Sequence, residues 1–477
     1  MLETIREYGI EQLSARGELA EVRRWHADHF ADLVERAQPH VITRGQLPWI
    51  ALLTAERDNI LTGLRFRCDV GDADGALAIA TGLGGFAMLM GNDIDSVSWI
   101  ADALAVPGAT DPELITVALG IFAMAGFFGR PETDELASVP LDLRETARRL
   151  GEIDFTRRPL GVLLRAAVAY FADERALADR YLAEGIASDD PWLSAAMLMF
   201  RASLAENEGD IATMRATLPV ALERFRELGE RWGLGGTLRS IGQLRMYDGD
   251  LAGAQAAYDE ALHLMHEMGS REDQSFLYMR LGEIAMRAGD SERATVQLDR
   301  ARQSAEQSGS SFEAAVAATM LAHMERLAGR PDAARELQAE AVERLAAINQ
   351  SHPAWGHAHA MVEAGNALQR LGEGDRAGAE VAARAALASG LASKDMPIVA
   401  NVTVVLAEIS SGSDPAQAAT MLGIAAALRG SEDDTSPQLR QLRGRLLDAL
   451  GDADFERAFR AGRELDRPGA LDHVRRW

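Results

Sequence analysis

The clearest hydrophobic pattern of the chain lies between Gly209 and Asn349, where small and apolar side chains return at one spacing. A polar turn that opens with Gly recurs every 40 residues, at Gly209-Asp210, Gly249-Asp250, Gly289-Asp290 and Gly329-Arg330. Met or Ala stands five positions after each leading Gly, Ala stands twelve after it, and Gly or Asn stands twenty after it. The pattern predicts an internal repeat in which each 40-residue unit contains two helices.

Elementary packing explains why such a unit forms a helical hairpin. Gly allows the tight turn, and the following Asp accepts hydrogen bonds from the free N–H groups that open the next helix. The Ala positions fall about two turns apart on one helix face, where small side chains let two helices approach closely. One hairpin cannot bury this face alone, whereas stacked hairpins do, so periods of about 20 to 50 residues indicate a solenoid.

The unit also has the residue pattern of a known repeat. Gly249-Asp250, followed by Ala254, Tyr258 and Ala261, resembles the second helix of a tetratricopeptide repeat. That repeat is usually about 34 residues long, so helices longer by about one turn are expected here. We therefore expect an all-α fold, a right-handed α/α superhelix of tetratricopeptide-like helical hairpins with a period of about 40 residues.

Composition and charge narrow the function classes. Ala, Leu, Arg and Glu dominate the 477 residues and only 15 are Pro, which favours helix throughout. A net charge of −23 argues against a nucleic-acid-binding surface, which needs a basic face. The one Lys of the chain, Lys394, is followed by Asp395, so no phosphate-binding loop is present. We expect neither ATP hydrolysis nor tight DNA binding.

Cysteine usage and the apolar runs bear on the compartment. Cys68 is the only cysteine, which excludes an intramolecular disulfide. The first residues are charged from Glu3 onward and do not have the apolar stretch of a signal peptide. The apolar run 114–129, sixteen residues long, is shorter than the roughly twenty needed to cross a bilayer. We expect a cytoplasmic protein.

Both ends of the chain carry further motifs. Near the start these are Leu2-Glu3-Thr4-Ile5-Arg6-Glu7-Tyr8, Arg24-x-His26 with Phe30, and Glu56-Arg57-Asp58-Asn59-Ile60. Near the end they are Met421-Leu422-Gly423-Ile424-Ala425-Ala426-Ala427-Leu428-Arg429, Leu450-Gly451-Asp452-Ala453-Asp454-Phe455 and Ala461-Gly462-Arg463-Glu464-Leu465. In this order they resemble the C-terminal region of actinobacterial transcriptional regulators of the AfsR and LuxR-like type.

In those regulators a signal-transduction NTPase domain ends in a winged helix, and a tetratricopeptide-like region follows. The resemblance implies that residues 1–20 are the end of a winged helix. We expect irregular hairpins over 21–159, the regular solenoid over 160–430 and a helical cap over 431–477. The NTPase core and the DNA-binding domain are not in the sequence, so the chain is either a piece of a larger regulator or a stand-alone relative.

Candidate chemistry is sparse. His263 and His266 lie one helical turn apart but have no third ligand nearby, and His352, His357 and His359 suit an exposed loop better than a metal site. The glycines in 82–85 loosely match a dinucleotide fingerprint but lie inside a helical apolar run, where close helix packing explains them better. We find no catalytic constellation and expect no enzyme activity, no metal and no cofactor.

A binding surface is the remaining expectation. If the hairpins pack as in tetratricopeptide repeats, the first helix of each unit lines a concave groove, at fixed distances before the turn Gly. For the central units this count selects Arg239, Gln243, Tyr247, Phe276, Met279, Glu283, Arg287, His323 and Arg326. Arg and aromatic side chains dominate binding hot spots, so a protein, a peptide or a small effector is the expected ligand. Arg239 and Arg287 should attract an acidic group.

Two functions remain open. The first is a non-catalytic sensor and protein-interaction module of a transcriptional regulator, which binds a partner protein or small effector and relays it to an NTPase or DNA-binding module. The second is a stand-alone tetratricopeptide-type adaptor unrelated to transcription. Direct binding of nucleic acid or membrane is expected in neither case.

Overall fold

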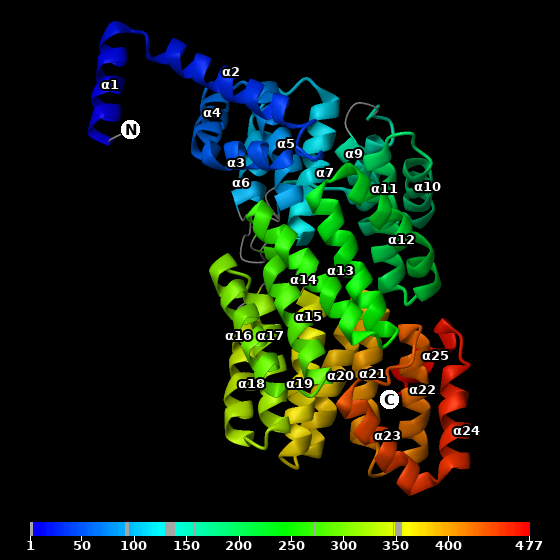
Figure 1. The fold of residues 1–477 in the computed structure, drawn as a ribbon. Coiled ribbons are helices and arrows are strands. Elements are labelled where there is room, and N and C mark those ends of the chain that lie inside the picture. Colours follow the sequence, from blue (N-terminus) through cyan, green and yellow to red (C-terminus); the bar gives the residue numbers. More distant parts are fainter. Residues whose placement is uncertain are drawn as a thin grey trace. The chain divides into compact units, whose positions relative to one another are not determined.

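The computed structural model describes residues 3–90, 95–128, 139–155, 159–270, 272–346, 348 and 355–477. These residues form 25 helices and no strand (Figure 1). The expected all-α fold of tetratricopeptide-like hairpins is confirmed. Residue contacts divide the chain into two compact units, Met1–Ser194 with Leu228–Trp232, and Ala195–Glu227 with Gly233–Trp477. No helix in the described ranges combines the length and apolarity that a bilayer-spanning segment requires.

The first unit contains ten complete helices and the start of the eleventh. They are α1 (Glu3–Arg16), α2 (Leu19–Ala37), α3 (Gln46–Ala55), α4 (Arg57–Asp69), α5 (Ala73–Met90), α6 (Asp95–Ala105), α7 (Pro112–Phe128), α8 (Leu143–Leu150), α9 (Pro159–Phe171), α10 (Arg175–Ile186) and α11 (Pro191–Asn207). The glycines of α5 let neighbouring helices come close. A Cβ added at Gly82 would lie 2.4 Å from Val34, and one at Gly84 would lie 2.6 Å from Ile121. The packing interpretation of this glycine cluster is confirmed.

The second unit continues with helices arranged in pairs. They are α12 (Ile211–Leu228), α13 (Arg231–Tyr247), α14 (Leu251–Met268), α15 (Glu272–Arg287), α16 (Ser291–Ser308), α17 (Ser311–Leu327), α18 (Pro331–Ala346), α19 (Trp355–Gly372), α20 (Arg376–Ser393), α21 (Met396–Ser410), α22 (Pro415–Arg429), α23 (Pro437–Leu450), α24 (Asp452–Arg463) and α25 (Arg467–Arg475). Successive helices from α15 to α22 contact one another, and α15, α17, α19 and α21 also contact in that order. The odd-numbered helices therefore form one layer of the stack.

The turns follow the repeat read from the sequence. Gly209, Gly249, Gly289 and Gly329 have φ between 68° and 79°, a region that side chains with a Cβ rarely adopt. The Asp250 carboxylate accepts from the Gly253 N–H at 2.9 Å, as the capping role predicts. The glycines that end the second helices, at 229, 269 and 309, also have positive φ, from 67° to 74°. Asn349, the last position of the frame, lies outside the described residues.

The small residues of the repeat are buried as expected. Ala254, Ala261, Ala294 and Ala301 are each 0 to 1 % exposed, because they lie where the two helices of a pair approach each other. The large side chains of the same core include Tyr258 and Leu298, both 0 % exposed. Packing of Ala against these residues holds each hairpin together.

The turn before α12 and the end of α22, more than two hundred residues apart in the sequence, also meet. A Cβ added at Gly209, in the turn between α11 and α12, would lie 2.2 Å from the carbonyl oxygen of Leu428, near the end of α22. A Cβ added at Gly430 would lie 2.2 Å from the carbonyl oxygen of Gly209. Arg467 donates a hydrogen bond to the backbone carbonyl of Glu208. The row of hairpins thus returns to its own starting point.

One local expectation was wrong. The segment containing Trp355, His357 and His359 was expected to be an exposed loop, but these residues form the first turns of α19. His357 Nε2 lies 3.1 Å from Asp395 Oδ2, and His359 Nδ1 lies 2.8 Å from Ser389 Oγ. The Trp355 ring stacks on His359 with centroids 4.1 Å apart. These contacts with α20 and the start of α21 stabilise a helix start there; His352 lies outside the described residues.

Candidate functional site

A stripe of half-buried side chains, three charged and one aromatic, runs along α15. Phe276, Arg280, Glu283 and Arg287 follow the spacing of one helix face, and each is partly exposed. Leu277, Leu281 and Ile284, on the adjacent face of the helix, are 1 to 4 % exposed. We call this stripe, together with Glu206 of α11, Arg239 of α13, and His323 and Arg326 of α17, the inner face of the second unit.

The Phe276 ring contacts two guanidinium groups. The Arg239 Cζ atom, from α13, lies 5.3 Å from the ring centroid, and the Arg280 Cζ atom lies 4.9 Å from it. Both separations are within the range of cation–π attraction. The ring therefore holds two like charges near one another and fixes the position of Arg239 between neighbouring hairpins.

Glu283 and Arg287 are the centre of the ion pairs on this face. Glu283 Oε2 lies 2.8 Å from Arg280 Nη1, and Glu283 Oε1 lies 2.7 Å from Arg287 Nη2. Burial disfavours the charged carboxylate, but Arg287 and Arg280 outweigh it and hold the pKa of Glu283 below its usual value. Glu283 is ionised at neutral pH and belongs to a fixed pair rather than to an open binding surface.

Arg287 also reaches the segment that follows α22. Its Nη1 atom lies 2.7 Å from Asp433 Oδ1 and donates to Thr435 Oγ1 at 2.6 Å. The side chains of Arg287 and Asp433 are only 15 % and 11 % exposed. Burial disfavours the ionised form of Asp433, but Arg287 is the main cause that keeps its pKa below the ordinary range. This ion pair joins residues 146 positions apart in the sequence.

Glu206, near the end of α11, differs from the other carboxylates of the inner face. Its side chain makes no ion pair or hydrogen bond among the described residues. Burial raises the pKa of Glu206 to about 7, while Arg280 and Arg239 act in the opposite direction. The same burial raises the pKa of Tyr247, and the charge of Glu206 adds to that effect. Glu206 is therefore poised between its neutral and charged forms near neutral pH.

The α17 end of the inner face carries a neutral histidine. The Arg326 Nη2 atom lies 3.1 Å from His323 Nδ1. Burial and, to a smaller extent, the Arg326 charge lower the pKa of His323 to about 4. Arg326 also donates to Gln369 Oε1, on α19, at 3.4 Å. His323 is thus an uncharged acceptor at neutral pH, with Nδ1 directed at Arg326.

The remaining residues of the predicted groove are more buried. Gln243 is 9 % exposed and accepts a hydrogen bond from the Tyr258 hydroxyl at 3.4 Å. Met279 is 7 % exposed and packs in the apolar core with Ala301 and Ala317. The half-buried stripe of α15 passes through Arg280 instead, one residue further along the helix. Whether any of the nine selected residues contacts a ligand stays a prediction.

Several residues of the inner face were not selected from the sequence. Glu206 stands three before Gly209, so the same count applied to the first hairpin would have found it. Arg429, 6 % exposed, donates to Asn401 Oδ1 at 3.2 Å, and its burial lowers its pKa. Arg429 and Asp433 lie outside the repeat frame, and no spacing in the sequence connects them with α15.

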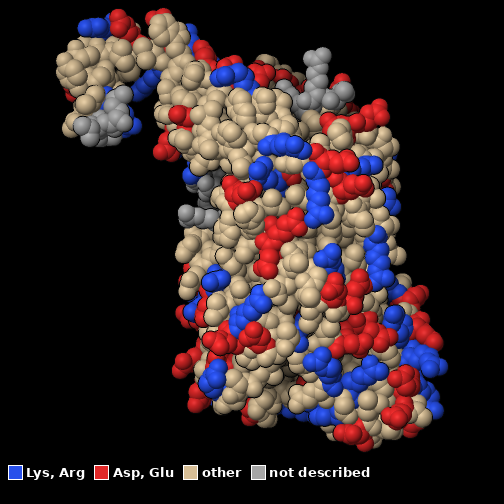
Figure 2. All heavy atoms as spheres, in the orientation of Figure 1, with Lys and Arg blue, Asp and Glu red and all other residues tan. Residues whose placement is uncertain are grey.

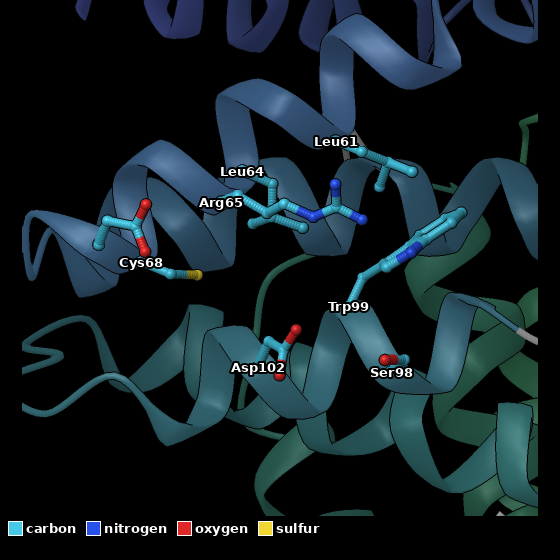
Figure 3. Close-up of a pocket in the computed structure, with 8 residues that line it drawn as sticks. Leu61, Leu64, Arg65, Cys68, Ser98, Trp99 and Asp102 are labelled. Carbon is cyan, nitrogen blue, oxygen red and sulfur yellow. The ribbon is translucent and has the colours of Figure 1, made fainter. Parts of the chain in front are cut away.

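The first unit contains a separate cleft between α4 and α6, with a volume of about 390 Å³. It is lined by Leu61, Leu64, Arg65, Cys68 and Asp69 of α4 and by Ser98, Trp99 and Asp102 of α6 (Figure 3). In neither unit do three or more His, Cys, Asp or Glu side chains of the described ranges converge on a point where they could hold a metal ion. Figure 2 shows acidic and basic side chains interspersed on the visible face.

Comparison with known proteins gives distant structural similarity only. Neither a protein-family model nor a curated protein matches the chain. BtubC from P. vanneervenii is 20 % identical over 44 % of this chain and 89 % of its own, with a TM-score of 0.37. A signal-transduction ATPase with numerous domains and a tetratricopeptide repeat sensor, from Pyrococcus horikoshii, is 14 % identical over 80 % of this chain and 55 % of its own, with a TM-score of 0.43.

A third solved structure is a Rap protein complexed with competence and sporulation factor. It is 13 % identical over 75 % of this chain and 94 % of its own, with a TM-score of 0.48. At this distance none of the three supports an argument about ligands. The helices and turns described above establish a tetratricopeptide-like helical-repeat fold, which is a fold suited to protein interaction.

Proposed function

We propose that this chain is a non-catalytic sensor and protein-interaction module whose inner face binds a partner protein or a small effector. The observation that supports this function best is the state of Glu206. It is a carboxylate without a hydrogen-bond partner among the described residues, on a face where Arg280, Glu283 and Arg287 are joined in ion pairs. A ligand that donates hydrogen bonds to Glu206 would satisfy a group that the protein itself leaves unsatisfied.

The chemistry of the inner face favours binding over catalysis. Burial raises the pKa values of Tyr247 and Tyr258, so neither phenol ionises to act as a base near neutral pH. His323 is held neutral with a pKa of about 4 by burial and by Arg326, which makes it a poor general base at pH 7. We infer a recognition surface with no cofactor.

The proposal extends to the biological setting. The resemblance of both chain ends to actinobacterial regulators of the AfsR and LuxR-like type supports a module that relays binding to an NTPase or DNA-binding partner in the cytoplasm. The alternative is a stand-alone adaptor of the tetratricopeptide type. A neighbouring reading frame that encodes a phosphate-binding loop and a winged helix favours the first, and a genome without one favours the second.

Site-directed photo-crosslinking in the native host tests the proposed surface. Phe276, whose ring contacts Arg239 and Arg280, is replaced by the photoreactive residue p-benzoyl-L-phenylalanine. Val381, 67 % exposed on α20, is replaced in the same way as the control. We expect a defined crosslinked species from position 276 and none from position 381.

The identity of the crosslinked species separates the two settings. A regulator with NTPase or DNA-binding domains supports the sensor, and an unrelated protein supports the adaptor. Equal crosslinking at both positions would show that the inner face is not the working surface. If native mass spectrometry of the purified chain instead detects a bound small molecule that Glu206→Gln removes, the ligand is an effector.

A further inference from the structure

The α4–α6 cleft of the first unit takes no part in the function proposed above. Its volume of about 390 Å³ lies at the small end of the range of about 300 to 1,000 Å³ that is typical of ligand pockets. Because all eight lining residues come from two neighbouring helices, the site is complete within the first unit. The size suits a small molecule.

The floor and one wall of this cleft are apolar. Leu61 and Leu64 are 7 % and 2 % exposed and form the floor. Trp99, from α6, is half-buried and stands over Leu61, and the Arg57 Cζ atom lies 5.2 Å from its ring centroid. The cation fixes the indole in place. An apolar group of a ligand would bury its surface against Leu61, Leu64 and Trp99.

The charges of the cleft are separated along it. The Arg65 guanidinium is directed toward Leu61 and Trp99, whereas the Asp102 carboxylate and the Cys68 thiol lie toward the other end (Figure 3). In the described part of the chain Arg65 and Asp102 take part in no ion pair and no side-chain hydrogen bond. The cleft therefore presents one cation, Arg65, and two carboxylates, Asp69 and Asp102, beside an apolar floor.

Cys68 does not change this charge pattern. Burial, with the nearby charges of Asp102 and Asp69, raises the pKa of its thiol to about 11. The thiol is therefore protonated and uncharged at neutral pH. It is neither a strong nucleophile nor a metal ligand, because both roles need the thiolate. Cys68, Asp69 and Asp102 do not converge as a set of metal ligands. A small organic molecule fits the cleft better than a metal ion.

We propose that the α4–α6 cleft binds a small zwitterion, an amino acid or short peptide. Its ammonium group would pair with Asp102, supported by Asp69, and its carboxylate would pair with Arg65. Its apolar side chain would lie on Leu61, Leu64 and Trp99. Both charged groups of the ligand meet a complement, so a molecule that carries only one of them leaves a charge of the cleft unpaired.

Isothermal titration of the full chain with three probes tests this pairing. The probes are L-leucine, 3-methylbutylamine, which has no carboxylate, and 4-methylpentanoate, which has no ammonium group. All three keep the same branched apolar end. We expect L-leucine to bind about tenfold more tightly than either single-charge probe, since the loss of one charged pair is of that order.

Two charge-removing variants assign each end of the cleft. Asp102→Asn should weaken the binding of L-leucine about tenfold. It should leave the affinity for 4-methylpentanoate unchanged, because that probe has no ammonium group to pair with Asp102. Arg65→Gln should weaken the binding of L-leucine by a similar factor and leave the affinity for 3-methylbutylamine unchanged. Asp58→Asn, at an exposed residue of α4 outside the cleft, is the matched control and should change none of the three affinities.

Three results would overturn the proposal. One is the absence of saturable binding of L-leucine at millimolar concentration. Another is equal binding of all three probes, which would mean that only the apolar floor is used. The third is the same affinity in Asp102→Asn and Arg65→Gln as in the wild type. None of these results bears on the inner face, whose crosslinking test uses the other unit.

Discussion

The inner face of the second unit and the α4–α6 cleft of the first contain similar side chains, but their arginines differ in exposure and in ion pairing. Both contain arginines, carboxylates and an aromatic ring that contacts a guanidinium. On the inner face, Arg287 pairs with Glu283 and Asp433 and is 15 % exposed. In the cleft, Arg65 is exposed and has no ion pair among the described residues. Residue type alone therefore does not distinguish a structural arginine from one available to a ligand.

The largest loss of unfolding free energy is expected when Arg287, which pairs with Glu283 and Asp433 on the inner face, is replaced. Arg287→Met leaves Glu283 with one partner fewer and Asp433 without its cation, in surroundings where both are largely buried. Loss of one partner of a buried pair costs about 3 kcal/mol or more, and denaturant unfolding should show this loss.

The control for Arg287 is Arg335→Met. Arg335 also pairs with two carboxylates, Asp332 and Glu373, but it is 54 % exposed. Its loss should cost no more than about 1 kcal/mol. If both variants unfold at the same denaturant concentration, burial does not separate the two kinds of arginine and the comparison fails.

The second prediction uses the pH dependence of Glu206. Its folded pKa of about 7 lies above the unfolded value of about 4.3, so the folded state keeps the proton between these limits and loses stability as pH rises through 7. Glu206→Gln, which stays neutral, should equal the wild type near pH 4.5 and be more stable above pH 7.5. The gain should be about 2 to 4 kcal/mol, since the two pKa values differ by about 2.7 units and one unit is worth about 1.4 kcal/mol.

Thermal unfolding from pH 4.5 to 8.5 measures this difference. Glu223→Gln, at an exposed position of α12, should follow the wild type at every pH. A difference in stability between Glu206→Gln and the wild type that is the same at every pH would show that Glu206 is already ionised over the whole range from pH 4.5 to 8.5. The carboxylate would then be an ordinary surface group, and the main support for the proposed function would be lost.

A smaller effect is expected at the Phe276 ring, which contacts two guanidinium groups. Phe276→Leu keeps an apolar side chain but removes the face that holds Arg239 and Arg280 together. We expect a loss of about 1 kcal/mol in unfolding free energy, of the size measured for cation–π contacts. Met320→Leu, a half-buried apolar residue of α17, is the control and should change stability less. Equal losses would mean that Phe276 contributes only buried area.

The smallest effect is expected in the cleft. Arg65→Gln and Asp102→Asn should each leave the unfolding free energy within about 0.5 kcal/mol of the wild type, because both residues are exposed and unpaired in the described part of the chain. The same denaturant series that measures Arg287→Met measures these variants. A loss above about 1 kcal/mol would show that the cleft charges are structural, like those of the inner face.

The repeat frame could be predicted because its causes are local. The positive φ of Gly249, the cap formed by Asp250 and the burial of Ala261 all follow from residues within a single hairpin. The stripe on α15 was only partly predicted. The count selected Phe276, Glu283 and Arg287, but it also selected Met279, which lies in the core, because the helices are longer than those of the usual repeat.

The rest could not be predicted because it depends on residues far apart in the sequence. Asp433 follows α22 and meets Arg287 of α15 only because the end of α22 is brought back to the earlier hairpins of the second unit. The cleft forms where the α4 stripe from Leu61 to Cys68 faces Trp99 and Asp102 of α6, and both stripes read as ordinary amphipathic helix. No spacing rule connects these pairs, since they arise from how the hairpins stack.

The meeting of Gly209 with Leu428 and Gly430 changes how the second unit should come apart. An open row of repeats behaves as a one-dimensional chain in which each unit is coupled to its neighbours, so it frays from its free ends. Here the turn before α12 is coupled to the end of α22 as well, through this backbone contact, and the Arg287–Asp433 pair couples α15 to the segment after α22. Neither end can fray without breaking a contact that closes more than two hundred residues of chain. The unit should unfold as one cooperative block, and it should fold slowly because this long-range closure carries a large loss of chain entropy.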